Sequence, residues 1–148
     1  MLAKAERELA RMDNAETLDD ERDAALNCAL GRWHMSDWAC KTLREEKRND
    51  IKAFFGEKSG QVKVNHVNSW VRKNCQEAEL VQAMATAAKH VNFDYHNTFD
   101  PDRTPPSQYE RGSLSLIDKQ GNVVLTRLAL QKLIYFWKSQ IGEIEWLY

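Results

Sequence analysis

The longest helical pattern in this 148-residue chain is residues 18–43, which read LDDERDAALNCALGRWHMSDWACKTL. Thr17 precedes the pattern as a good N-cap, and acidic residues in the first turns oppose the positive end of the helix dipole. At about 100° per residue, one face is apolar. It consists of Leu18, Ala25, Leu26, Ala29, Leu30, Trp33, Cys40 and Leu43. We therefore expect a long central helix over about residues 18–48.

Three further segments, residues 62–75, 77–92 and 126–148, also place apolar residues at helical spacing. Thr126 is positioned to cap the last of them. Their apolar stripes are Val64, Val67, Trp70, Val71 and Cys75; Leu80, Val81, Met84, Ala87, Ala88 and Val91; and Leu130, Leu133, Ile134, Trp137, Ile141 and Ile144. Residues 1–16 are rich in charge and supply only Leu2, Leu9 and Met12, which predicts a charged N-terminal arm or a short docking helix.

A β-hairpin is predicted over residues 113–126, where two short apolar runs flank Lys119-Gln120-Gly121. Residues 49–60 indicate a short helical turn followed by a loop, and residues 94–112 indicate one long loop. The sequence thus predicts a mainly α, single-domain helical bundle over residues 17–148. It has four to five helices and one β-hairpin before the C-terminal helix.

Charge and cysteine content restrict the classes of function. Lys and Arg number 21 against 22 Asp and Glu, so the basic excess typical of nucleic-acid or anionic-membrane binding is missing. The charged N-terminal residues and the lack of a long apolar run predict neither a signal peptide nor a membrane span. Three cysteines without C-x-x-C spacing predict buried thiols in a reducing compartment. We expect a soluble cytoplasmic protein.

Two groups of residues could carry chemistry. His34 and Asp37 are three residues apart, so they share one side of the central helix, either as a functional pair or as a buried polar pair that bonds to another helix. Lys89, His90 and His96 form the second group, and we expect His90 to contact Asp37 as a brace between helices.

No cofactor or metal is predicted from these residues. His90 and His96 with Asp94 have plausible ligand types, but their spacing matches no established zinc motif. The glycine-rich phosphate-binding, zincin and nucleophile-elbow motifs are also missing from the sequence.

Several short motifs resemble the HEPN-like group of small helical bacterial and phage proteins. They are His34-x-x-Asp37-Trp38, Ala88-Lys89-His90, Asp118-x-x-Gly121 and Phe136-Trp137. The resemblance covers roughly residues 20–140 and implies an up-and-down helical bundle that is often dimeric. Some members are ribonucleases that use an R-x4-6-H motif, but no histidine here has an arginine five to seven residues upstream.

Two functions remain open on this basis. The first is a non-catalytic interaction or accessory protein of a bacterial or phage system, with a protein partner or a second copy of the chain. It is motivated by aromatic residues off the core stripe of the last helix, with Tyr135, Phe136, Trp146 and Tyr148 as interface candidates. The alternative is a HEPN-like, metal-independent ribonuclease of the toxin or defence type, with catalytic candidates His34, Asp37, Lys89, His90 and His96.

Overall fold

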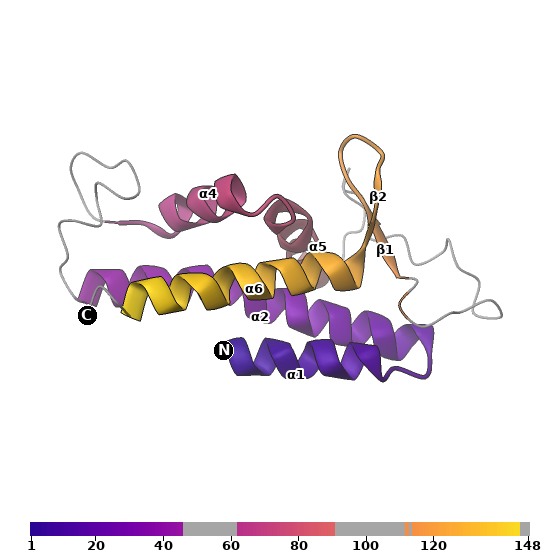
Figure 1. Cartoon of the computed structure of the whole chain (residues 1–148). Coiled ribbons are helices and arrows are strands. Elements are labelled where there is room, and N and C mark those ends of the chain that lie inside the picture. The colour runs from indigo at the N-terminus through magenta and orange to yellow at the C-terminus, as the bar shows by residue number, and fades with distance from the viewer. Residues whose placement is uncertain (46–61, 91–111, 113, 146–148) are drawn as a thin grey trace.

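The computed structural model describes residues 1–45, 62–90, 112 and 114–145 (Figure 1); for Trp33, residues 87–90 and residues 141–145 it describes the backbone only. The expected fold class is confirmed: five helices and one two-stranded antiparallel hairpin lie in the described part of the chain. In chain order the elements are α1 (Leu2–Asp13), α2 (Leu18–Glu45), α4 (Val64–Asn74), α5 (Ala78–His90), β1 (Ser115–Ile117), β2 (Val123–Leu125) and α6 (Thr126–Glu145). The predicted segments 49–60 and 94–112 lie outside the described residues, except for Gly112.

The long helix α2 is the centre of the fold, and α1, α4, α5 and α6 all contact it. Figure 1 shows α1 running back along α2 from the turn that joins them, with α4 and α5 on the other side of α6 from α1. The cap expected at Thr17 is confirmed, since its Oγ1 accepts a hydrogen bond from the Asp20 backbone N–H at 3.1 Å. Near the other end of α2, Arg44 Nε donates to the Val62 carbonyl at 2.7 Å, which holds the start of the next segment.

The buried face of α2 is wider than its apolar pattern predicts and is turned toward α1. Leu26 and Leu30, which the pattern places at the core, are only partly buried, whereas Arg32 is 1% exposed. The cause is α1, which covers a second side of α2: Cys28 Sγ donates to the Ala5 carbonyl at 3.3 Å, and Gly31 lies against Ala5. Also buried outside the predicted stripe are Glu21, Ala24, Cys28, Met35, Ser36 and Ala39.

The hairpin joins α5 to α6, and its two faces differ in character. Leu116 pairs with Val124 on the face toward the helices, where Leu116 is buried. On the outer face Ser115 pairs with Leu125 and Ile117 with Val123. The turn needs glycine at residue 121, whose φ of +84° lies in the left-handed region. The Thr126 side chain does not make the expected cap, because its buried Oγ1 has no hydrogen-bond partner among the described residues.

Candidate functional site

The first predicted site group, His34 and Asp37, lies together but on the surface. His34 Nδ1 and Asp37 Oδ2 are 3.4 Å apart, and the two side chains are 44% and 53% exposed. The alternative in which this pair is buried is therefore wrong for these residues. The pair lies on the side of α2 that its neighbouring helices leave open to solvent, since the buried arc of α2 turns toward α1.

The position of the second predicted group, Lys89, His90 and His96, relative to His34 and Asp37 falls outside what the structure describes. The side chains of Lys89 and His90, and the whole of His96, lie outside the described residues, so the expected contact between Asp37 and His90 stays a prediction. Within the residues that the structure describes, no three His, Cys, Asp or Glu side chains converge to hold a metal ion.

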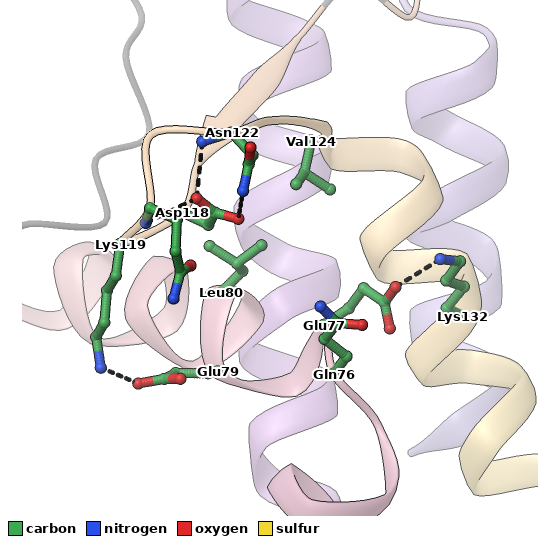
Figure 2. Close-up of a pocket in the computed structure, with 10 residues that line it drawn as sticks. Gln76, Glu77, Glu79, Leu80, Asp118, Lys119, Asn122, Val124 and Lys132 are labelled. Atoms are coloured by element: carbon green, nitrogen blue, oxygen red, sulfur yellow. Dashed lines mark hydrogen bonds and ion pairs between the residues drawn. The ribbon is translucent and has the colours of Figure 1, made fainter.

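A polar cleft of about 450 Å³ lies where the start of α5, the hairpin turn and α6 meet. Figure 2 shows Leu80 and Val124 beside one another in this cleft, with charged side chains around them. Glu77 pairs with Lys132 of α6, and Glu79 pairs with Lys119 of the hairpin turn. The other described residues of the lining are Gln76, Asp118, Gln120 and Asn122.

Asp118 is committed to the hairpin turn. Its carboxylate accepts hydrogen bonds from the Gln120 and Asn122 backbone N–H groups at 2.9 and 2.8 Å, and from Asn122 Nδ2 at 2.9 Å. These bonds, the Asn122 side chain first, lower the pKa of Asp118, because they stabilise the charged form. Likewise the hydrogen bond to Glu77 raises the pKa of Lys132. Among the residues that the structure describes, the lining includes no histidine or cysteine, and its ion pairs attach the hairpin and α6 to α5.

The other prominent feature is an apolar surface on α6 and the hairpin. Six large apolar side chains in the described part of the chain are exposed, and four of them fall between residues 123 and 135. Leu128 and Tyr135, 45% and 59% exposed, lie on the solvent side of α6, and we call this pair the α6 surface. Val123 and Leu125 lie on the outer face of the hairpin.

Tyr135 is held in place by a chain of hydrogen bonds along α6. Asp13 of α1 accepts from Arg127, whose Nη1 donates to Gln131 Oε1 at 3.1 Å. Gln131 Nε2 in turn donates to the Tyr135 hydroxyl at 3.4 Å. An exposed aromatic side chain that is already ordered loses less conformational entropy when it binds a partner.

Three basic side chains of α6 border the α6 surface, and each of the three forms an ion pair with an acidic residue. Arg127 pairs with Asp13 and Lys138 with Glu6, both on α1. On the opposite border, Lys132 pairs with Glu77 at the start of α5. The α6 surface is thus apolar at its centre and neutralised along both edges.

The interface candidates from the sequence divide into three cases. Tyr135 is exposed, as an interface residue must be, whereas Trp146 and Tyr148 lie outside the described residues. Phe136 is instead partly buried: its ring lies 5.2 Å from that of Trp70 on α4 and 5.6 Å from that of Trp137. The spacing of apolar residues along α6 cannot show that a side chain of another helix, here Trp70, packs against Phe136.

The exposed residues of β2 were missed by the sequence analysis. Strand alternation over Asn122-Val-Val-Leu125 puts residues 123 and 125 on the same face, and this signal could have identified Val123 and Leu125. The three cysteines, in contrast, are buried free thiols as expected. Burial raises the pKa of the Cys28 thiol to about 11, so it is not an activated nucleophile.

None of the helices in the described part of the chain combines the length and the apolar composition needed to cross a bilayer. No family model, curated protein or solved structure matches the chain.

Proposed function

We propose that this protein is a non-catalytic interaction or accessory protein that binds a protein partner through the α6 surface. The observation that carries the proposal is the concentration of exposed apolar side chains between residues 123 and 135. Exposed apolar side chains that gather in one region of a soluble protein are typical of a surface that another molecule covers. Tyrosine in particular is enriched at protein interfaces, because it offers a large apolar ring with a polar end.

The chemistry of the other surface groups supports a binding role over a catalytic one. Glu77 and Glu79 in the polar cleft are neutralised by lysines, and Asp118 is engaged by its own turn. Catalysis needs acids, bases or nucleophiles that converge on one substrate position. Those groups in the cleft instead act as attachments between α5, the hairpin and α6.

Photo-crosslinking in the cells that express the protein tests this proposal. Tyr135 is replaced by p-benzoylphenylalanine, which keeps an aromatic ring at the position and captures whatever lies against it. Lys41, 75% exposed on α2, carries the same replacement as the control. A discrete crosslinked species is expected at residue 135 and not at residue 41. Equal or absent crosslinking at the two positions would contradict the interaction role.

The ribonuclease alternative is favoured by one specific observation. His34 and Asp37 are accessible and only 3.4 Å apart, so the carboxylate can orient an imidazole that faces solvent. Because some members of the HEPN-like group are ribonucleases, the resemblance to that group would make RNA the substrate of this pair.

This alternative is tested with purified protein and labelled RNA in EDTA. An enzyme would cleave the RNA without metal and lose this activity in His34→Ala, whereas the interaction proposal expects no cleavage by either protein. Glu45→Ala, on the exposed end of α2, is the matched control.

A further inference from the structure

We infer that the N-terminal half of α1, residues 2–8, is a strap that opens from α2 while the rest of the fold stays intact. Figure 1 shows α1 lying along α2, and this half of α1 lies over Arg32 and Cys28. The closed strap keeps both side chains buried, whereas opening exposes them to solvent. The strap therefore controls whether another molecule can reach the Cys28 thiol.

Arg32 is the residue that opposes closure of the strap. It is 1% exposed, and its Nε and Nη1 have no acceptor among the described residues. Its Nη2 donates to the Leu2 carbonyl of the strap at 3.4 Å, which is long for a hydrogen bond. Burial lowers the pKa of Arg32, although Cys28 and Glu6 act in the opposite direction. Because a buried charge with unpaired donors gains free energy on hydration, opening is favoured at this residue.

The two ends of α1 are held unequally. At its C-terminal end Met12 is buried, and Asp13 forms the two-pronged ion pair with Arg127 of α6. At the strap end no side chain caps the helix, and the first turn contains no acidic residue to oppose the helix dipole. The ion pair between Glu6 and Lys138 holds the strap, but both side chains are more than a third exposed. The strap end of α1 is therefore the end that opens first.

Cys28 reports the opening because the strap covers it. Its side chain is fully buried, and its Sγ donates to the Ala5 carbonyl at 3.3 Å. Burial raises the pKa of this thiol to about 11, so the closed form is unreactive. When the strap opens, the thiol loses this burial and lies one helical turn from the Arg32 guanidinium, which favours the reactive thiolate.

Labelling of the folded protein with iodoacetamide measures the opening. Mass spectrometry of the digested protein follows the peptide that contains Cys28, and its rate is divided by the rate in unfolded protein. We expect labelling at least about 10-fold faster than global unfolding allows, with little dependence on low concentrations of urea, because a local opening exposes little surface. Labelling at the rate of global unfolding would overturn the strap.

Arg32→Met tests the role of the buried guanidinium. Methionine keeps an apolar contact under the strap and has no donor to hydrate, so labelling of Cys28 should slow by about 10-fold. Arg72→Met is the matched control, since Arg72 lies on the surface of α4, and it should label like the unmodified protein. If Arg32→Met labels as fast as the unmodified protein, Arg32 does not drive the opening and the inference fails.

A reversible disulfide tests whether the strap is the part that moves. A Cβ added at Gly31 would lie 3.7 Å from the Cβ of Ala5, which is within the range that a disulfide spans. The double variant Ala5→Cys, Gly31→Cys should therefore lock the strap when oxidised. Hydrogen exchange of the strap amides should be about 10-fold slower in the oxidised than in the reduced form. Equal exchange in the two forms would show that the strap does not open and would overturn the inference.

Discussion

Arg127 and Asp13 form a two-pronged ion pair that joins α6 to α1, with Arg127 Nη2 2.9 Å from Asp13 Oδ2 and Arg127 Nε bonded to the other carboxylate oxygen. The residues are 114 positions apart in sequence, so the contact fastens the N-terminal helix onto the C-terminal one. The same guanidinium donates to Gln131 and so orders the α6 surface.

Asp13→Asn should lower the free energy of unfolding by about 0.5–1 kcal/mol. The bidentate geometry is favourable, but both side chains are more than a third exposed, and solvent screens the pair. Urea unfolding measures the change. Asp19→Asn is the control: Asp19 pairs with Arg22 one turn away, but its side chain is 87% exposed, and we expect almost no effect. Equal effects of the two variants would contradict a stabilising role for the Asp13 pair.

Arg32→Met should leave stability unchanged or raise it by about 1–2 kcal/mol. Arg32 is 1% exposed, and its Nε and Nη1 have no acceptor among the described residues. Burial accordingly lowers the pKa of Arg32. Methionine fills a similar volume and removes the unpaired donors. Arg32→Ala removes the same donors but leaves a cavity, so it should be less stable than Arg32→Met. Strong destabilisation by Arg32→Met would contradict the prediction, because it would mean that the buried guanidinium makes favourable hydrogen bonds that the substitution removes.

Cys28 should make the protein less stable as the pH rises above 9. Burial raises the pKa of this thiol from 9.0 to about 11, so the folded state holds its proton over a range where the unfolded state has lost it. The folded state then binds more protons, and the free energy of unfolding falls with rising pH, by about 2 kcal/mol between pH 9 and pH 11. Denaturation curves at about pH 8, 9, 10 and 11 measure the free energy of unfolding across this pH range.

The control for Cys28 is Cys28→Ala, which lacks the titrating group but is equally affected by lysines and tyrosines. Its stability should fall less steeply over the same pH range than that of the unmodified protein. Parallel pH profiles for the two proteins would exclude Cys28 as the source of the loss.

Alanine substitutions at two glycines should have opposite signs. Gly121 has φ +84°, a conformation that costs an alanine about 1 kcal/mol, so Gly121→Ala should destabilise the hairpin. Gly31 lies inside α2, where an added Cβ would make an ordinary 3.7 Å contact with Ala5. Gly31→Ala should therefore stabilise the protein by about 0.5–1 kcal/mol through helix propensity. Thermal unfolding of the pair checks both signs, and a shift in the same direction would contradict the prediction.

The candidate site could be predicted only in part. His34 and Asp37 share a helix, so their spacing alone brings them together. Whether they are buried depends on which helices cover α2, and no pattern within α2 contains that information. The same limit applies to Phe136, which lies off the α6 core stripe but packs on Trp70 of α4.

By itself the sequence determined the local elements, because helices and hairpins follow from spacing, caps and turn residues within a few positions of one another. Thr17 capping α2 and Gly121 in the hairpin turn are of this kind. Tertiary structure alone decided which faces are covered, because burial comes from segments distant in the chain. Thus α1 buries Arg32, a charged residue that the predicted apolar stripe of α2 does not include, while packing leaves Leu128 and Tyr135 exposed on α6.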